Sequence, residues 1–187
     1  MGFHTFDADK AAGLEDEGRR YQSFSREELL GALELTGTET VADLGSGTGF
    51  YTDDIAPYAE QVYAVDIQPE MHDFYREKGV PETVDLVTSS VSELPFLDGE
   101  LDSAVATMTY HEFAGVDSLA ELARVVRPGG RLVVCDWAAD GEGERGPPLD
   151  ERYDASEAAA ALEDVGFEIV TEQTRPETFV VVAVRAE

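Results

Sequence analysis

Apolar residues along this chain follow two alternating patterns, short continuous runs and helical repeats. The runs are rich in valine, leucine and alanine and have the length of buried strands. They predict strands at residues 41–44, 62–65, 84–87, 101–106, 132–135, 167–172 and 178–184. Between them, apolar positions three or four residues apart predict helices at 50–58, from 69 onward, from 116 to 127 and at 155–165. Alternating strands and helices indicate an α/β fold with a doubly wound, mostly parallel sheet.

Turn and capping residues divide the chain into a helical preamble and a core. Ser25 and Glu28 have the spacing of a capping box ahead of an apolar helical stretch, so residues 1–36 are predicted to be mainly helical. A helix should stop at residues 127–130, Arg-Pro-Gly-Gly, because proline and paired glycines do not extend a helix. The length fits one domain, in which the preamble forms an N-terminal lid and residues 37–187 form the core.

Charge is the most unusual feature of the composition. The chain has 40 acidic and 13 basic residues, a net charge of −27, and its bases are 11 arginines and two lysines. Such a surface repels itself in dilute buffer, whereas the screening length falls to roughly 3 Å at 1 M salt. The composition therefore predicts a halophilic protein adapted to a salt-rich cytoplasm. An acidic patch for a basic partner is the alternative, but the acids are spread over the whole chain.

Further features of the sequence indicate where the protein is located in the cell and which partners it does not bind. No apolar stretch approaches the roughly 20 residues that span a bilayer, and the N-terminal region has no leader pattern, so we expect a cytoplasmic protein. No basic stripe is present that could neutralise phosphates, so nucleic-acid binding is not expected. The single cysteine, Cys135, lies in an apolar run and is predicted to be buried rather than reactive. No metal site is predicted.

Residues 43–50, Asp-Leu-Gly-Ser-Gly-Thr-Gly-Phe, follow the first predicted strand. Alternate glycines allow the backbone to turn sharply and to lie against a ligand. A dinucleotide fingerprint would have its third glycine at position 50, where this chain has Phe50, and Asp43 is poorly suited to an anionic phosphate. An acid here instead suits a ligand with an ammonium and a sulfonium group. Asp66 ends the next strand, 21 positions after Gly45, where its carboxylate can accept hydrogen bonds from two ribose hydroxyls.

With these motifs, the sequence resembles the class I S-adenosylmethionine-dependent methyltransferases, particularly the small-molecule branch of ubiquinone and menaquinone methyltransferase-like proteins. Residues 41–52 resemble the first motif of this family, and residues 62–71 resemble its acidic second-strand motif. Residues 90–96 resemble the segment before the fourth strand, and residues 124–136 the helix-turn-strand with Arg-Pro-Gly-Gly. The resemblance covers nearly the whole chain. It implies a seven-stranded Rossmann-like sheet with an antiparallel final strand, and S-adenosylmethionine as the cofactor.

The same resemblance implies the cofactor contacts residue by residue. The residues that would line the methionine part of the cofactor are Asp43, Gly45, Ser46 and Gly47, and Gly49 is a further cofactor-binding position of the loop. Asp66 would hold the ribose, and Ile67 would flank the adenine. The family often has aspartate where this chain has Ser90, so the adenine amino group would meet a neutral hydroxyl, and Val91 would supply a backbone N–H. Thr107 is expected near the methionine amino group.

Residues that several other methyltransferases need are missing. The stretch after the fourth strand, residues 106–110, lacks the Asn/Asp-Pro-Pro-aromatic turn of amino-methylating nucleic-acid enzymes. Methylation at C5 of cytosine needs a cysteine nucleophile and arsenite methylation needs several thiols, and Cys135 inside a predicted strand serves neither. We therefore expect a small-molecule methyl acceptor. A non-catalytic S-adenosylmethionine sensor and an acidic interaction scaffold on the same fold are the alternatives.

His111 is the candidate catalytic residue. Methyl transfer from a sulfonium is an in-line displacement with an activated donor, so positioning and desolvation can supply much of the acceleration. If a general base is used, His111 is the best candidate, because it follows the fourth strand at the cofactor edge and titrates near neutral pH. A purely structural position at the start of a helix is the alternative. His72, in a predicted helix, is expected to be solvated.

Aromatic residues flank the predicted site. Two roles, a lid over the acceptor or a seal for the core, are open for those near the N-terminus: Phe3, His4, Phe6, Tyr21 and Phe24. Trp137 follows the fifth strand, where it either walls the acceptor pocket or anchors the long loop 138–154.

We predict that thermal stability climbs steeply as potassium or sodium chloride is raised from dilute buffer to molar concentration. The physical reason is that salt screens the mutual repulsion of the acids behind the −27 charge. Melting temperatures across a salt series measure the effect. A flat melting temperature would reject salt adaptation and would favour the acidic-partner interpretation.

Overall fold

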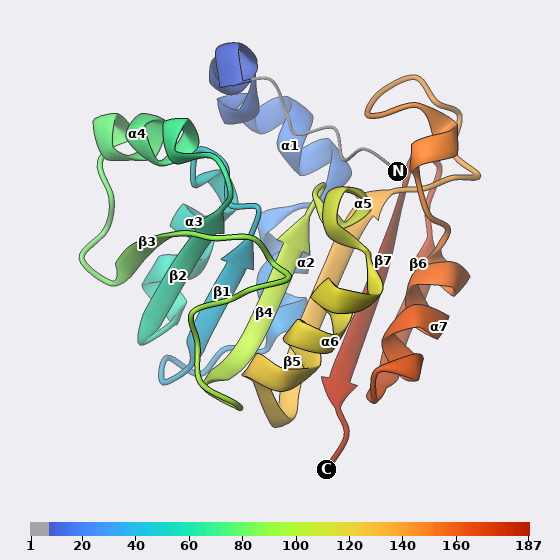
Figure 1. The fold of residues 1–187 in the computed structure, drawn as a ribbon. Helices are drawn as coiled ribbons and strands as arrows, with labels where there is room; N and C mark the ends of the chain where they lie inside the picture. Colours follow the sequence, from blue (N-terminus) through green and yellow to red (C-terminus); the bar gives the residue numbers. More distant parts are fainter. Residues whose placement is uncertain (1–7) are drawn as a thin grey trace.

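The computed structural model describes residues 8–187, which form a seven-stranded sheet covered by helices (Figure 1). Phe3, His4 and Phe6, three members of the predicted aromatic lid, lie outside the described residues. The strands are β1 (Thr40–Leu44), β2 (Gln61–Asp66), β3 (Val84–Thr88), β4 (Leu101–Thr107), β5 (Val126–Trp137), β6 (Phe167–Thr174) and β7 (Thr178–Arg185).

The strand order across the sheet is β3-β2-β1-β4-β5-β7-β6. Strand β1 pairs in parallel with both β2 and β4, so the direction of winding reverses beside it. Strand β7 runs antiparallel to β5 and β6, and its arrow in Figure 1 points opposite to that of β5. The predicted doubly wound, mostly parallel sheet with an antiparallel final strand is therefore confirmed. Such sheets bind ligands beyond the carboxyl ends of the strands where the order reverses, here above β1 and β4.

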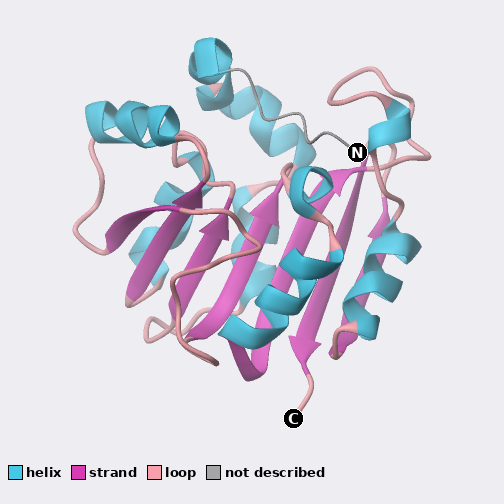
Figure 2. Cartoon of the chain, in the orientation of Figure 1, coloured by secondary structure: helices cyan, strands magenta, loops and turns pink. Residues whose placement is uncertain are grey.

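Helices cover both faces of the sheet. In Figure 1, α6 (Val116–Val125) and α7 (Ala155–Asp164) lie in front of it, and α2 (Arg26–Leu33) and α3 (Phe50–Ile55) lie behind it. The remaining helical segments are η1 (Ala8–Glu15), α1 (Glu17–Ser23), η2 (Ala56–Tyr58), α4 (Pro69–Lys78), α5 (Tyr110–Phe113) and η3 (Leu149–Glu151). Figure 2 shows the loops after β1, β2, β4 and β5 gathered at the upper edge of the sheet. No helix within residues 8–187 is long and apolar enough to cross a membrane.

Each face of the sheet has its own apolar cluster. Successive residues of β4 point to opposite faces, so Ala104 packs with α6 and α7 whereas Val105 packs with α2 and α3. Tyr51 on α3 is buried in the second cluster, and its hydroxyl donates to the backbone oxygens of Arg20 and Phe24. Burying a large apolar side chain contributes roughly 1.5–3 kcal/mol. Tyr51 therefore fastens the N-terminal helices to the sheet.

The segment before β5 differs from the sequence expectation. Helix α6 ends at Val125, two residues earlier than predicted, and the Arg-Pro-Gly-Gly segment at 127–130 is already part of β5. A Cβ on Gly130 would lie 2.8 Å from the backbone oxygen of Asp102, so this glycine permits the close approach of β5 to β4. The predicted burial of Cys135, further along β5, is confirmed.

His72 is buried, so the prediction of a solvated residue is wrong. Its ring on α4 packs toward β3, with Nδ1 3.0 Å from Thr88 Oγ1. The buried face of α4 is formed by Met71, His72 and Tyr75. Most of the other residues of this helix are charged, so the sequence pattern does not indicate that a polar residue such as His72 lies on the buried face. Burial lowers the pKa of His72, although the charge of Asp66 acts in the opposite direction.

We predict that His72 makes the fold sensitive to mild acid. The folded protein binds a proton at His72 less readily than the unfolded chain does, because its pKa is lowered. Its contribution to stability is therefore complete above the ordinary histidine pKa of about 6.5 and is lost as the pH falls below that value. Urea unfolding between about pH 7.5 and 5.5, in molar salt, measures the free energy of unfolding.

The variant His72→Gln has no titrating ring and should lose less stability over this interval. His111→Gln is the matched control, because the pKa of His111 is raised and its linkage has the opposite sign. Equal losses in wild type and His72→Gln would contradict the prediction.

Candidate functional site

A cavity of about 950 Å³ opens at the carboxyl-end edge of the sheet. Its walls come from the loops after β1 to β5, and from the N-terminal helical segments. Pockets for one small ligand usually enclose roughly 300–1,000 Å³. A cavity at the upper end of this range can hold a cofactor together with an acceptor.

The loop after β1 is held by the end of β2. Backbone N–H groups of Gly45 and Ser46 both donate to the oxygen of Val65, at 2.8 and 2.9 Å. The N–H of Gly47 donates to Asp66 Oδ2 at 2.8 Å. The glycine loop and the acidic strand end therefore form one hydrogen-bonded unit in the cavity wall.

The alternate glycines serve both backbone conformation and close packing. Gly45, Gly47 and Gly49 have φ angles of +73°, +54° and +79°, in the left-handed region that glycine tolerates best. A Cβ on Gly45 would lie 2.6 Å from the Thr109 side chain, and a Cβ on Gly49 would collide with the ring of Tyr75. The sharp turn expected from the sequence is present. Two of the glycines also make room for side chains of the protein itself.

Asp43 lies behind the glycine loop and is almost fully buried. Thr52 Oγ1 donates to Asp43 Oδ2 at 2.6 Å, whereas Oδ1 has no hydrogen-bond partner among residues 8–187. Burial raises the pKa of Asp43 to about 6, although the hydrogen bond from Thr52 and the charge of Arg20 lower it. A buried acceptor without a donor indicates a position for a donor from outside the protein.

Arg20 is a site residue that the sequence analysis missed. It lies on α1, lines the cavity, and stacks over the ring of Tyr51 with its guanidinium carbon 4.6 Å from the centroid. Its Nε is buried and lacks an acceptor within the described part of the chain. Burial lowers the pKa of Arg20, and the charges of Tyr51 and Asp43 partly offset this. Two adjacent arginines, Arg19 and Arg20, within an acidic stretch were the available signal.

Asp66 and Ile67 form the cavity wall at the end of β2. The Asp66 carboxylate accepts the N–H groups of Gly47 and Gln68, each at 2.8 Å. A carboxylate has about four acceptor positions, so two remain for hydroxyl donors. Ser46 Oγ, nearby, is buried and has no partner among the residues from 8 onward. This wall can therefore bind several polar groups of one ligand.

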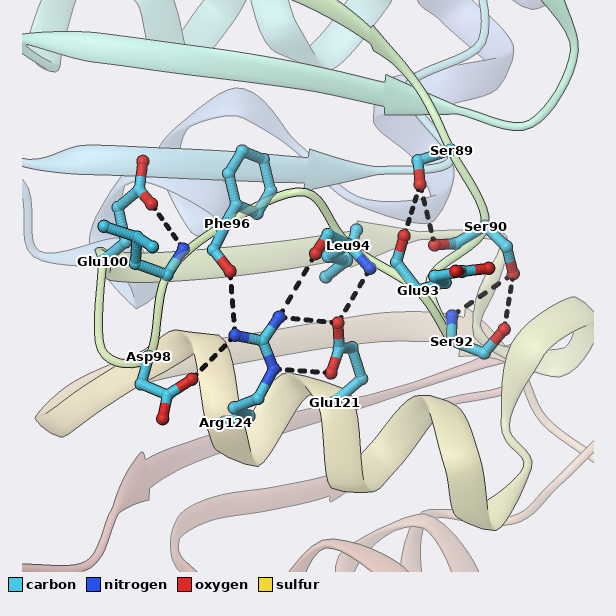
Figure 3. Close-up of polar contacts among 11 residues, drawn as sticks. Ser89, Ser90, Ser92, Glu93, Leu94, Phe96, Asp98, Glu100, Glu121 and Arg124 are labelled. Atoms are coloured by element: carbon cyan, nitrogen blue, oxygen red, sulfur yellow. Dashed lines mark hydrogen bonds and ion pairs between the residues drawn. The ribbon is translucent and has the colours of Figure 1, made fainter.

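The segment after β3 brings Ser90 and Val91 to the opposite wall of the cavity. Ser90 Oγ lies 2.8 Å from Ser92 Oγ and accepts the Ser92 N–H at 3.3 Å (Figure 3). The hydroxyl predicted to meet the adenine is therefore also part of a local turn. Ser89 Oγ donates to the backbone oxygen of Glu93 at 2.6 Å and closes the same turn.

Arg124 on α6 fixes the continuation of this segment, as Figure 3 shows. Its guanidinium donates to the backbone oxygens of Phe96 and Leu94, at 2.8 and 3.2 Å, and to Asp98 at 2.8 Å. Glu121, paired with Arg124, accepts the Leu94 N–H at 2.8 Å. Hydrogen bonds to charged groups are stronger than neutral ones, so α6 holds the segment firmly.

His111 lies on α5, a short helix that the sequence patterns did not predict, and lines the cavity. Its Nδ1 is 3.0 Å from both carboxylate oxygens of Asp136, which is fully buried at the end of β5. Burial lowers the pKa of His111, but the hydrogen bond and charge of Asp136, with the charge of Glu112, raise it above its ordinary value. Burial raises the pKa of Glu112 to about 7. His111 and Glu112 thus share this wall, and the charge of each shifts the pKa of the other.

The first residues of the described chain form the roof over the glycine loop. Leu14 lines the cavity, and Glu15 accepts a hydrogen bond from Thr48 Oγ1. Lys78 Nζ bridges Glu15 Oε2 at 3.2 Å and Asp53 Oδ2 at 2.8 Å. One of the two lysines in the chain therefore ties η1 to α3 and α4.

The described aromatic residues have different roles: Trp137 lies in the cavity wall, whereas Tyr21 and Phe24 belong to the core. Trp137 lines the cavity and also anchors the long loop, because a Cβ on Gly146 would lie 2.5 Å from its ring. Phe24 is buried in the core, and Tyr21 donates to Asp54 at 2.8 Å. Tyr21 and Phe24 therefore seal the core and do not line the cavity.

All but two of the predicted site residues line this cavity. Those in its walls are Gly45, Ser46, Gly47, Asp66, Ile67, Ser90, Val91, Thr107 and His111. Asp43, at the end of β1, and Gly49, the last glycine of the loop, do not line it. Arg20 and Glu112 also line the cavity, and neither was predicted.

Known proteins resemble this chain in sequence and in fold. A family model described as a methyltransferase domain matches residues 42–134. The crystal structure of an S-adenosylmethionine-dependent methyltransferase from Aquifex aeolicus superposes with a TM-score of 0.85 at 31% sequence identity. The superposition covers 96% of this chain and 98% of that one.

Curated relatives are longer than this chain. The biotin biosynthesis bifunctional protein BioHC of Cellvibrio japonicus is 35% identical over 127 residues, which is 67% of this chain and 25% of the relative. The demethylmenaquinone methyltransferase of Mycobacterium sp. strain KMS is 34% identical over 116 residues, 62% of this chain and 49% of the relative. The chain thus spans a quarter to a half of the length of these relatives.

Proposed function

The chain belongs to the S-adenosylmethionine-dependent methyltransferases, and from this premise we propose that it transfers the methyl group of S-adenosylmethionine to a small-molecule acceptor. The cofactor of this family carries an ammonium, a carboxylate, a sulfonium and a ribose. Our proposal places all of these groups, together with the acceptor, in the cavity above β1 and β4.

One observation carries the proposal: buried polar atoms in the cavity wall, at Ser46 and Arg20, and next to it, at Asp43, lack partners among the described residues. Asp43 Oδ1, Ser46 Oγ and Arg20 Nε are all buried and unpaired within residues 8–187. An unpaired buried polar group costs about 1–3 kcal/mol, so these atoms favour a ligand that pairs with them. The ammonium group of the cofactor would donate a hydrogen bond to Asp43, and its carboxylate would accept one from Arg20. A nicotinamide dinucleotide offers phosphates at this place and leaves Asp43 unpaired.

The remaining cofactor contacts follow from the other walls. Asp66 keeps acceptor capacity for two ribose hydroxyls, and Ile67 offers an exposed apolar face to the adenine. Val91 would supply its N–H to the adenine ring, and Ser90 its hydroxyl. Thr107, at the end of β4, lines the same cavity and would lie near the methionine amino group.

Alignment of the acceptor with the methyl donor contributes to the reaction. When bound, the cofactor supplies an activated methyl group, so an in-line approach of the acceptor can supply much of the acceleration. Residues of η1, α1 and the loop anchored by Trp137 line the cavity and would shield the acceptor from water. His111 is the group that can take a proton from the acceptor, because it lines the cavity beside its buried partner Asp136.

A small acceptor fits the cavity and the charge of the chain. Demethylmenaquinone, named for one relative, is a small molecule. A nucleic acid would meet a surface of −27 net charge, and we propose that it is not a substrate. We also propose that the enzyme works in a salt-rich cytoplasm, with its N-terminal helices as the lid of a single domain.

We predict that Asp66→Ala weakens the binding of S-adenosylhomocysteine, the demethylated product, by about 1–3 kcal/mol. The loss arises because hydrogen bonds from ribose hydroxyls to a charged carboxylate disappear. Calorimetry in molar salt measures the affinity at one site per chain. Asp73→Ala is the matched control, because this exposed aspartate on α4 pairs only with Arg76 in the ion pairs of the described residues. Unchanged affinity in Asp66→Ala, or tighter binding of a nicotinamide dinucleotide, would contradict the site.

We further predict that the protein methylates a compound in a small-metabolite extract of its source cells. Incubation with methyl-labelled S-adenosylmethionine in molar salt should give a product heavier than its precursor by one methylene group. Mass spectrometry detects the product, and Asp66→Ala should reduce its rate of formation. Tight cofactor binding without any labelled product would favour the sensor alternative. Absence of cofactor binding would favour the acidic scaffold.

A further inference from the structure

Asp136 organises the acceptor end of the cavity from behind. It lies near the end of β5, is fully buried, and accepts three N–H groups. The backbone N–H of His111 donates to Oδ2 at 2.7 Å, and the N–H of Trp137 donates to Oδ1 at 2.7 Å. The third donor is Nδ1 of the His111 ring, 3.0 Å from both oxygens. One carboxylate therefore fixes both residues that wall the acceptor pocket.

The contact with Asp136 decides which ring nitrogen of His111 can act as a base. A carboxylate only accepts hydrogen bonds, so the proton shared with Asp136 belongs to Nδ1 of the ring. In the neutral ring, Nε2 is then the atom with a lone pair. Nε2 lies 3.9 Å from Glu112 Oε1, and both His111 and Glu112 line the cavity. The ionisable groups around the ring are Asp136 from β5, Glu112 from α5 and Glu151 from η3.

We propose that the acceptor is a hydroxyl compound, methylated on oxygen, whose proton is taken by Nε2 of His111 while Asp136 acts as the positioning residue. This inference rests on the proposed methyl transfer and specifies its acceptor. The O–H bond breaks, and its proton moves to Nε2. The oxygen electron pair forms the new bond to the methyl carbon, and the carbon–sulfur bond breaks with its electron pair on sulfur. The products are a methyl ether, S-adenosylhomocysteine and one proton, which His111 returns to solvent.

The need for a base distinguishes oxygen from nitrogen acceptors. A neutral amine offers its lone pair without losing a proton first, so an oriented histidine–aspartate pair adds little to its reaction. An alcohol or phenol keeps its proton at neutral pH, and a positioned base contributes typically about 10²–10⁴-fold in rate. The buried partner of His111 also favours the imidazolium that forms during transfer, since Asp136 and Glu112 raise its pKa. The dyad thus suits a substrate that must lose a proton.

The tautomer of His111 is the first test, and it needs no acceptor. Nitrogen NMR of the protein labelled with ¹⁵N-histidine and saturated with S-adenosylhomocysteine reports which ring nitrogen carries the proton. We expect a neutral ring protonated at Nδ1, with a pKa above the ordinary 6.5 or so. Asp136→Asn should lower this pKa, whereas the signals of His72, which lies outside the cavity, should not move. A neutral His111 protonated at Nε2 would overturn the proposal.

The pH profile of turnover is the second test. Wild type should show an acid limb above about pH 6.5, because His111 is active only when its ring is neutral. In Asp136→Asn the limb should move to lower pH and the plateau rate should fall, a combination that a merely destabilised protein does not produce. In His111→Ala the limb should vanish and the rate should fall by about 10²–10⁴. An acid limb at the same pH in all three proteins would overturn the role of the dyad.

The methylated atom is the third test, and it does not depend on any variant that folds poorly. The labelled product formed from S-adenosyl-[methyl-¹³C]methionine and the metabolite extract gives a ¹³C shift that separates O-methyl from N-, S- and C-methyl groups. We expect an O-methyl signal. A methyl group on nitrogen, sulfur or carbon would overturn this inference and leave the proposed methyl transfer intact. Failure of S-adenosylhomocysteine to bind would instead overturn the proposed function itself.

Discussion

The end of β2 holds the glycine loop, and the rest of the site depends on that attachment. Val65 accepts two N–H groups of the loop through its backbone oxygen, and Asp66 accepts a third through its carboxylate. The loop cannot move without breaking these bonds, so the glycine loop and the end of β2 keep a fixed separation in the cavity wall. The same carboxylate retains acceptor positions toward the cavity. The end of β2 thus holds the glycine loop in place and also presents a carboxylate to the cavity.

Two populations of acidic residues have different physical roles in this protein. Exposed acids produce the large negative charge, and salt screens them because they face solvent. Buried acids need hydrogen-bond donors instead, and they differ in how many they have. Asp136 accepts three N–H groups and Asp66 accepts two, whereas Asp43 accepts one hydroxyl and leaves Oδ1 unpaired. Asp43 is therefore the buried acid of these three that keeps an oxygen without a donor among the described residues.

Two sets of charged contacts fasten segments of the cavity wall to neighbouring helices. Arg124 and Glu121 fasten the segment after β3 to α6, and Lys78 fastens η1 to α3 and α4. Both devices are ion pairs close to the surface, which are worth little singly in solvent. Arg124 gains strength from backbone acceptors that do not depend on a second charge. The segment after β3 is therefore held by hydrogen bonds to the backbone as well as by charge, and salt screens these hydrogen bonds less than it screens an exposed ion pair.

The sequence alone determined the alternation of strands and helices, the antiparallel final strand expected from the family resemblance, and the cavity positions of Asp66 and most of the glycine loop. These features are local: apolar runs, capping residues and glycine spacing lie within short stretches of chain. Only the tertiary structure decided that His72 is buried, that Arg20 reaches the cavity, and that Asp136 holds His111. Strands β4 and β5 pair Thr107 with Cys135. His111 follows β4 closely and Asp136 is the next residue of β5, so the two side chains meet at one edge of the sheet. Register between distant strands is set by packing of the whole sheet, and no short stretch of sequence contains it.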